Sequence, residues 1–391
     1  MKEVVIVSAV RTPIGSFQGA LSALSSPQLG AIVIKEAVKR AGIKNEDVSE
    51  VIMGCVLPAG VGQAPARQAS ILAGLPESVP CMTINKVCGS GLKSVMLAAQ
   101  AIQCGDADVV VAGGMESMSN VPYYLDKVRS GLRMGNSTVT DGMIKDGLWD
   151  VYNNFHMGSA ADLCAREMNI SRLQQDEFAT QSYKKTLAAI EKGSFKEEIV
   201  EVKLKTKKGE VVVSIDEEPS KVNYEKGLQL KPAFDKDGTV TAFNSSKIND
   251  GAAALVIMSK EKADELSLKP LAKIISQISF AQKPEWFTTA PGFAIINILK
   301  KAGLKLEDID LIEANEAFSV QCLAVNEIAG LNPEKVNVNG GAIALGHPIG
   351  ASGARILTTL LYALKNRNVK RGLATLCIGG GEASAVIVER L

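Results

Sequence analysis

The stretch AGIKNEDVSEVI, residues 41–52, decides how this chain is expected to fold, because it recurs as AGLKLEDIDLIE at residues 302–313. The two copies share five identities, and several other positions exchange one apolar residue for another. Downstream, each copy continues into a helix opened by glycine, near Gly91 and near Gly353, and then into an apolar strand that ends in glycines. This agreement in order indicates a duplicated unit rather than a chance match.

The order of elements in each copy predicts the fold class. Strands and helices alternate, which is typical of α/β units with mainly parallel sheets and helices on their faces. In the first copy we expect strands at 4–10, 51–56, 82–87 and 109–112, and helices at 29–40, 66–75 and 92–104. In the second copy we expect strands at 272–280, 309–313 and 373–377, and helices at 294–302, 317–328 and 352–366.

Between the two copies the composition changes. Residues 120–158 are rich in Gly, Tyr, Asn and Met, and a charged helix over 172–192 and strands near 199–204 and 210–215 follow. This stretch is too long for a plain loop, so an inserted subdomain is expected, after which a strand over 250–258 returns to the first copy. The expected division is an N-terminal half at 1–118 plus 249–270, an insertion at 119–248 and a C-terminal half at 271–391.

Composition excludes several classes of protein. The 43 basic and 42 acidic residues nearly cancel, so no charge pattern for nucleic acid or membrane binding is present. The basic run at 203–208 is flanked by Glu201 and Glu210 and is expected to be solvated surface. No apolar run approaches the ~20 residues of a membrane span, and the chain enters a strand-like run too early for a secretory signal.

The cysteines bear on the compartment. There are seven, an odd number, and none has Cys-x-x-Cys spacing. This pattern argues against a disulfide framework and against a metal site, and it favours the reducing cytoplasm.

Cys88 is the first candidate for chemistry. It lies in NKVCGSG, residues 85–91, where an apolar stretch turns into a helix. The free N–H groups of a helix N-terminus favour a thiolate and lower a cysteine's pKa. The glycines allow a substrate to approach the backbone closely. A buried structural cysteine is the alternative for this motif alone.

Two further segments favour the catalytic interpretation. His347 is one of only two histidines and lies in the glycine-rich GHPIGASG, residues 346–353, just before a helix. Cys377 ends an apolar strand and precedes three glycines. A nucleophile, an imidazole and a second thiol at element ends indicate acyl transfer at sulfur. The glycines lack the spacing of a nucleotide phosphate loop and the order of a dinucleotide site.

With GGMESMS at 113–119, HMG at 156–158, NEAF at 315–318 and CIGGG at 377–381, the chain resembles the thiolase family over nearly its whole length, bacterial acetyl-CoA acetyltransferases in particular. The resemblance implies a thiolase fold, a five-layered αβαβα core of two similar halves with a loop subdomain that grips coenzyme A. It also implies a homotetramer. The implied substrates and products are acetyl-CoA, acetoacetyl-CoA and CoA, with no permanently bound cofactor.

The resemblance also implies roles for single residues. Cys88 would carry the acetyl group, His347 would accept its proton, and Cys377 would remove the α-proton of a second acetyl-CoA. One oxyanion site would be His347 with a water held by Asn315, and the other would be the backbone N–H groups of Cys88 and Gly379. Asn315 could instead cap a helix that begins near residue 317.

A second set of residues is implied to contact coenzyme A. Among them, Lys221 fills an arginine-like position, and His156 taken alone would be an ordinary packing histidine. The full set is Ser246, His156, Lys221, Leu148, Phe234, Met157 and Phe318.

Two stretches depart from the family pattern. FNSSK at 243–247 stands where the family commonly has GNASG, and FTTAPGF at 287–293 where it commonly has MGxGP. Phe243, Lys247, Phe287 and Thr288 therefore leave the acyl-chain length open. The leading hypothesis is reversible condensation of two acetyl-CoA molecules. The alternatives are a 3-ketoacyl-CoA thiolase for longer chains and a catalytically impaired acyl-CoA-binding scaffold. Whether Cys88 and Cys377 can form a disulfide also stays open.

Overall fold

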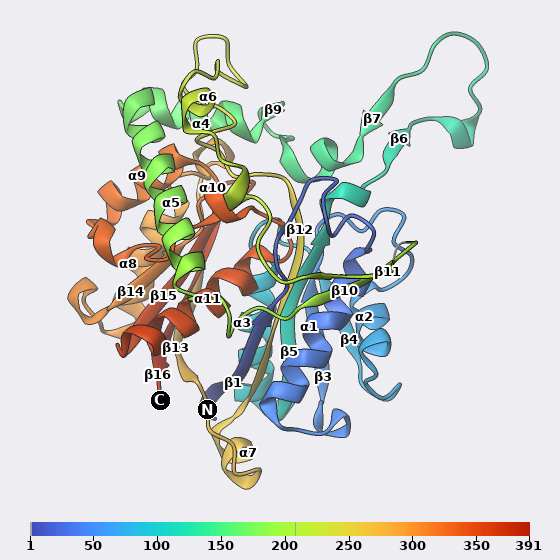
Figure 1. Cartoon of the computed structure of the whole chain (residues 1–391), viewed down its shortest axis with the longest axis vertical. Helices are drawn as coiled ribbons and strands as arrows, with labels where there is room; N and C mark the ends of the chain where they lie inside the picture. The colour runs from blue at the N-terminus through green and yellow to red at the C-terminus, as the bar shows by residue number, and fades with distance from the viewer. Residues whose placement is uncertain (1, 208) are drawn as a thin grey trace.

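The protein is described here by a computed structural model that covers residues 2–207 and 209–391 (Figure 1). One large sheet carries both copies of the repeat, in the strand order β14-β15-β16-β13-β1-β12-β5-β3-β4. The first copy supplies β1 (Val4–Arg11), β3 (Glu50–Gly54), β4 (Cys81–Ile84), β5 (Val109–Ser117) and β12 (Asn249–Ser259). The second supplies β13 (Ala272–Ala281), β14 (Leu311–Ala314), β15 (Arg371–Ile378) and β16 (Glu382–Arg390). The two copies meet where β1 pairs with β13 through Val5 and Ile6.

The expectation of mainly parallel sheets is wrong. Among the strands of the described sheet, parallel pairing is confined to β14 with β15 and to β3 with its neighbours β4 and β5. The centre is antiparallel because β12 returns between β1 and β5, and because β16 folds back on β15 after the turn at residues 379–381. β12 agrees with the strand expected at 250–258, whereas β16 was not expected. The strands that pair with β12 and β16 cannot be identified from a local sequence pattern.

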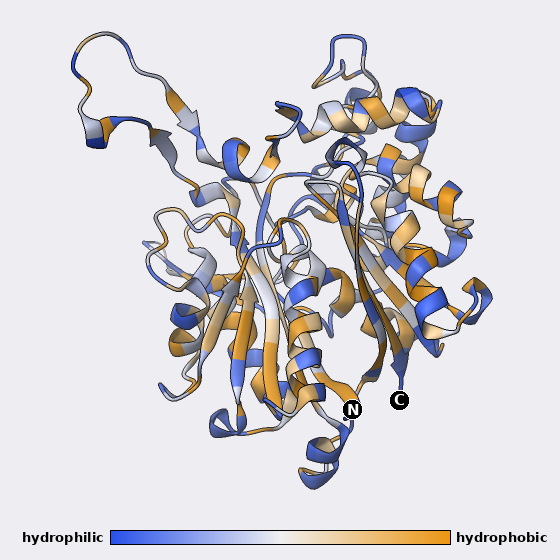
Figure 2. Cartoon of the chain, turned by 180° about the vertical axis from the view of Figure 1, so that it is seen from behind, coloured by the Kyte–Doolittle hydropathy of each residue, from blue (hydrophilic) through white to orange (hydrophobic). Residues whose placement is uncertain are grey.

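Although its strands are continuously hydrogen-bonded, the sheet has two halves, one from each copy, and these halves form the expected five layers with three sets of helices. The inner helices α3 (Ser90–Cys104) and α11 (Ser352–Arg367) share one apolar cluster with strands of both copies. The helices α1 (Ser26–Ala41) and α2 (Pro65–Ala73) cover the outer face of the first copy, and α8 (Ala290–Ala302) and α9 (Ser319–Ala329) cover that of the second. Figure 2 shows the apolar residues concentrated along the strands and the helix faces that cover them.

The glycines of the two repeated helix starts have a packing role that the sequence analysis did not foresee. A Cβ atom on Gly91 would lie 2.8 Å from the backbone nitrogen of Ala354, and one on Gly353 would clash with the backbone of Leu92. The N-terminal ends of α3 and α11 therefore approach each other as closely as their backbones allow. This contact brings the segments that carry Cys88 and His347 together.

Many of the residues between β5 and β12 form smaller elements at the end of the sheet opposite to the chain termini, whereas residues 172–213 run back beside the core (Figure 1). A long arm contains β6 (Tyr123–Leu125) and β7 (Val139–Asp141) and projects from the molecule. The other elements are β8 (Trp149–Asp150), β9 (Phe155–His156), α4 (Met157–Glu167), α5 (Arg172–Glu191), β10 (Val202–Thr206), β11 (Gly209–Val213) and α6 (Tyr224–Leu228). The charged helix and the two strands are confirmed, whereas α4 was not expected.

Three short elements complete the chain. They are β2 (Gly15–Ser16), α7 (Lys260–Glu265) and α10 (Ala342–Leu345), which leads into His347. In the basic run, Lys203, Lys205 and Lys207 are exposed as expected, and Lys208 lies outside the described residues. Within the described parts of the chain, no helix is both long and apolar enough to span a bilayer.

Candidate active site

A strained turn between β4 and α3 presents Cys88. Val87 has a φ of 45°, in the left-handed region that a β-branched residue avoids. Side chains hold it there: Ser90 Oγ accepts from the Lys86 N–H at 2.8 Å and donates to the Val87 carbonyl at 2.7 Å, and Asn85 Oδ1 accepts from the Val87 N–H at 2.9 Å. Because these contacts form the turn, the expected strand at 82–87 ends earlier, at Ile84.

One cavity of about 420 Å³ brings the three candidate catalytic groups together. Cys88, His347 and Cys377 all line it, as does Gly379. Six of the expected coenzyme A contacts also line it: Leu148, His156, Met157, Phe234, Ser246 and Phe318. Further lining residues that the sequence analysis did not propose as contacts include Phe17, Met118, Glu218, Lys247, Ile248, Phe287 and Ile349.

Two expected site residues do not line this cavity. Asn315 lies behind His347, with its Oδ1 accepting from Arg355 Nη2 at 3.4 Å and its Nδ2 3.5 Å from His347 Nδ1. It does not cap α9, which begins at Ser319 without a side-chain cap. Lys221 donates to Ser16 Oγ at 2.6 Å and lines a neighbouring pocket of about 250 Å³, which shares Glu218, Ala242 and Lys247 with the main cavity.

The hydrogen bonds of His347 indicate its tautomer. Nδ1 lies 2.6 Å from Ser352 Oγ, and Ser352 Oγ donates to the Pro348 carbonyl at 3.0 Å. A hydroxyl has one hydrogen, so with that hydrogen on Pro348 the ring carries its proton on Nδ1 and donates it to Ser352. Nε2 is then a bare acceptor, and it has no hydrogen-bond partner among the described residues. Burial, with Arg355 nearby, lowers the pKa of His347 to about 3, which keeps the ring neutral and able to act as a base.

The apolar cavity favours the protonated form of both thiols. Burial raises the pKa of Cys88 to about 11, although the backbone N–H groups of Gly379 and of Cys88 itself act on the sulfur in the opposite direction. Burial, together with the nearby Cys88, raises the pKa of Cys377 well above its usual value. The pKa of Cys88 is therefore raised and not lowered as the helix N-terminus led us to expect, because desolvation in an apolar cavity outweighs the effect of the N–H groups. All seven cysteines carry free thiols in the structure.

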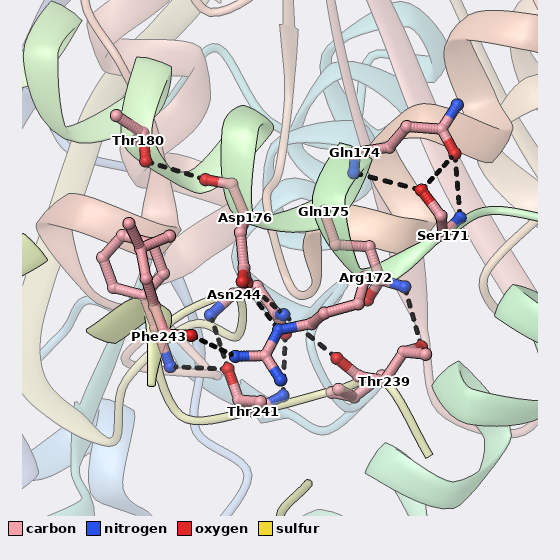
Figure 3. Close-up of polar contacts among 12 residues, drawn as sticks. Ser171, Arg172, Gln174, Gln175, Asp176, Thr180, Thr239, Thr241, Phe243 and Asn244 are labelled. Carbon is pink, nitrogen blue, oxygen red and sulfur yellow. Dashed lines mark hydrogen bonds and ion pairs between the residues drawn. The ribbon is translucent and has the colours of Figure 1, made fainter. Parts of the chain in front are cut away.

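One wall of the cavity is a loop that α5 holds in place (Figure 3). Asn244 Nδ2 donates to Asp176 Oδ1 at 2.8 Å, and Asn244 Oδ1 accepts from the Thr241 N–H at 2.8 Å. Asp176 also accepts from Arg172 Nε at 2.7 Å. On the far side, the Ser246 N–H donates to the Ala317 carbonyl at 2.9 Å, so Ser246 is fixed beside Phe318.

The residues that depart from the family pattern lie in different places. Phe243 stacks on Tyr183, with ring centroids 5.7 Å apart, and does not line the main cavity. Phe287 lines it, whereas Thr288 is buried outside it. Lys247 lines it, and its Nζ donates to the Ser245 carbonyl at 2.7 Å; burial lowers its pKa to about 8.

His156 has two structural contacts as well as its place in the cavity wall. Its Nδ1 accepts from the Gly158 N–H at 3.0 Å and caps α4, and its ring stacks on Phe234 at 4.6 Å. The ring is therefore a fixed part of the wall. Over residues 2–207 and 209–391, no group of three or more His, Cys, Asp or Glu side chains is arranged to hold a metal ion.

Comparisons with known proteins agree along the whole chain. The family model for the N-terminal domain of thiolase matches residues 4–261, and that for the C-terminal domain matches residues 268–390. The chain is 56% identical to the acetyl-CoA acetyltransferase of Cupriavidus necator over 392 aligned residues, which covers both chains completely. It is 53% identical to acetyl-CoA acetyltransferase 2 of Arabidopsis thaliana, covering 100% of this chain and 98% of that one.

A solved structure shows the same agreement in three dimensions. The crystal structure of the Bacillus anthracis acetyl-CoA acetyltransferase superposes with a TM-score of 0.98 at 44% sequence identity. The match covers 100% of this chain and 99% of that one.

Proposed function

The chain belongs to the thiolase family, and from this premise we propose that it is an acyltransferase that condenses two acetyl-CoA molecules reversibly to acetoacetyl-CoA and CoA. One observation carries the proposal: a single apolar cavity is lined by Cys88, His347 and Cys377, in a chain whose full-length relatives are named acetyl-CoA acetyltransferases. Coenzyme A thioesters are then the substrates.

Acetylation of Cys88 is the first half-reaction. His347 Nε2 takes the Cys88 proton, and the thiolate attacks the thioester carbon. The negative oxygen that forms is stabilised by the backbone N–H groups of Cys88 and Gly379, and the loss of one such donor typically costs ~2.7–4 kcal/mol. The C–S bond to CoA then breaks. Because Cys377 is protonated at rest, it gives its proton to the departing CoA thiolate.

Condensation is the second half-reaction. The Cys377 thiolate removes an α-proton from a second acetyl-CoA, and the enolate oxygen accepts a hydrogen bond from the now protonated His347 Nε2. We propose that Asn315, which lies beside His347, holds a water that donates to the same oxygen. The enolate carbon attacks acetyl-Cys88, and the released Cys88 thiolate recovers its proton from His347.

The length of the acyl chain that the enzyme accepts is the part of the proposal that needs a test. Phe287 lines the cavity and packs edge-to-face against Phe318, with ring centroids 6.2 Å apart, and we propose that this bulk favours short acyl groups. CoA-dependent cleavage of 3-ketoacyl-CoA substrates from C4 to C10 tests this: we expect the highest kcat/KM at C4. Faster cleavage at C8 than at C4 would identify a longer-chain thiolase. An impaired scaffold would bind CoA but incorporate no acetyl label at Cys88.

We propose that the pantetheine chain of coenzyme A lies against the cavity wall formed by Ser246 and by the stacked pair of His156 and Phe234. Leu148, Met157 and Phe318 complete the apolar surface of this wall. Lys221 lies in the adjoining pocket, where its ammonium group could meet a phosphate of coenzyme A.

The division of the chain and its assembly are also proposals. We propose halves at 1–118 plus 249–270 and at 271–391 with an insertion at 119–248, since β12 pairs with β1 and β5. A homotetramer is supported by the apolar surface of the projecting arm, where Met134 is 99% exposed, and by the uncovered Leu72 on α2 and Met82 on the edge strand β4. Seven free thiols fit a reducing cytoplasm.

A further inference from the structure

Glu116 is a buried acid that the proposed reaction does not use. It lies on β5, within the GGMESMS segment, and is 0% exposed. We propose that Glu116 is a positioning residue that sets the separation between Cys88 and His347, which lie on different copies of the repeat. The inference rests on the catalytic roles proposed for those two residues.

The carboxylate joins two loops. Its Oε2 accepts from the Val56 N–H and from the Gly350 N–H, both at 2.9 Å, and its Oε1 accepts from the Leu57 N–H at 3.2 Å. Val56 follows β3 of the first copy, whereas Gly350 precedes α11 of the second. One side chain therefore links a loop of the first copy to a turn of the second.

From Val56 the contacts continue to Cys88. The Val56 carbonyl accepts from Asn85 Nδ2 at 3.3 Å, and Asn85 Oδ1 accepts from the Val87 N–H at 2.9 Å. Val87 is the strained residue directly before Cys88. A shift of the loop at Val56 would move this turn.

From Gly350 the contacts continue to His347. Gly350 lies so close to the carboxylate that a Cβ atom on it would be 2.5 Å from Glu116 Oε2. In the same turn, the Pro348 carbonyl accepts from both the N–H and the hydroxyl of Ser352, and Ser352 Oγ holds His347 Nδ1. The hydrogen bonds that orient the ring thus belong to the turn that Glu116 holds.

Glu116 also has an electrostatic effect that mere packing would lack. Burial is the main reason why the pKa of Cys88 is raised, and the charge of Glu116 adds to it. Burial likewise raises the pKa of Glu116 to about 7, against the effect of its three N–H donors. Another titratable group lies beside Glu116: the Sγ of Cys55 is 3.6 Å from Glu116 Oε1. The titratable groups that line the cavity with Cys88 include Cys377 and His347.

The test compares Glu116→Gln, Glu116→Asp and the wild-type protein. Glutamine keeps the size but turns an NH₂ group toward N–H donors, so we expect kcat for acetoacetyl-CoA cleavage to fall at least tenfold. KM should stay within threefold, because Glu116 does not line the cavity. The pH midpoint for alkylation of Cys88 should fall in Glu116→Gln, which has lost the charge, but not in Glu116→Asp, which keeps the charge and loses only reach.

Two further variants make the test decisive. Asp310→Asn is the matched control, because Asp310 also accepts from two backbone N–H groups, those of Lys370 and Arg371, but outside the cavity lining; its kcat should be unchanged. Asn85→Ala removes the hydrogen bonds of the exposed Asn85 to the Val56 carbonyl and the Val87 N–H. It should lower kcat tenfold, and this can be measured even if Glu116→Gln does not fold.

A kcat within twofold of the wild type in a folded Glu116→Gln or in Asn85→Ala would overturn the inference, as would an unchanged alkylation midpoint in Glu116→Gln. If the protein is an impaired scaffold and not an active thiolase, the wild-type protein will show no cleavage. The alkylation shift would still be measurable in that case, so the two failures are distinguishable.

Discussion

Each of the three side chains that we propose to react favours a protonation state that it must leave during turnover. Cys88 and Cys377 are thiols because the cavity is apolar, and His347 is neutral for the same reason. The proposed mechanism passes protons among these groups and the substrate. It requires no permanent charge in the free enzyme, which suits an apolar cavity.

Substitution of the two cysteines should separate the half-reactions. Cys88→Ala should reduce both directions to background and take up no acetyl label, because it has no nucleophile. Cys377→Ala should still be acetylated at Cys88 but should condense at least a thousandfold more slowly, because no base removes the α-proton. Mass spectrometry of the Cys88 peptide and a coupled assay check both. Near-normal condensation by Cys377→Ala would exclude Cys377 as the base.

The buried imidazole predicts a pH dependence of stability. Below pH ~6.5 the unfolded chain protonates His347, whereas the folded chain does so only near pH 3. The free energy of unfolding should therefore fall as the pH drops through this window, by up to about 1.4 kcal/mol per pH unit.

His347→Asn should lack this contribution, which urea unfolding of both proteins at several pH values would measure. The pKa values of Glu116 and Glu313 are raised, so these groups act in the opposite direction, but they are common to both proteins. Parallel stability curves for the two proteins would contradict the assignment.

At the scale of elements, the cavity is built from loops that lie between rigid supports. The turn before α3 is held by Asn85 and Ser90, and the wall at residues 239–247 is held by α5 and by the start of α9. In each case a side chain such as Asn85 or Asn244 makes hydrogen bonds to more than one residue. Substrate binding should therefore depend on residues that hold the cavity wall without contacting the substrate.

Asn244→Ala tests this dependence. It removes the buried contacts with Asp176 and Thr241, which we expect to cost about 3 kcal/mol of stability. It should also raise KM for acetyl-CoA at least fivefold while kcat changes less, because Ser246 shifts and Cys88 does not. Thr180→Ala is the control: Thr180 bonds only to its own helix, at the Asp176 carbonyl, and its KM should stay normal (Figure 3). Equal KM values in the two variants would exclude the support role.

At the scale of the whole molecule, the arm between β6 and β7 stands out from the core with its apolar residues uncovered. Tyr123, Leu132 and Met134 are all exposed on it. An arm of this kind is stable only if it packs against something, and a second copy of the chain is the partner that fits the proposed homotetramer.

Met134→Glu should weaken that assembly. A charge at the fully exposed tip would be buried in the interface, so we expect a smaller species by light scattering at micromolar concentration. Leu173→Glu, on the exposed surface of α5, is the matched control and should leave the mass unchanged. An unaltered mass for Met134→Glu would show that the arm does not form the interface.

Features that depend on the local order of residues could be predicted from the sequence. Apolar periodicity located nearly every strand and helix of both copies, and glycine beside Cys88, His347 and Cys377 identified the turns that meet at the cavity. Such patterns are readable because helix and strand periods and turn geometry are set by residues close together in the chain.

Features that depend on contacts between distant segments could not be predicted from local patterns. The antiparallel centre of the sheet follows from β12 and β16 inserting beside partners far away in sequence. Lys221 lies outside the main cavity because Ser16 and Glu217 hold it. The pKa values of the thiols are raised by burial, which depends on packing between distant segments. The position of Glu116 between two loops likewise depends on hydrogen bonds to residues far away in the chain.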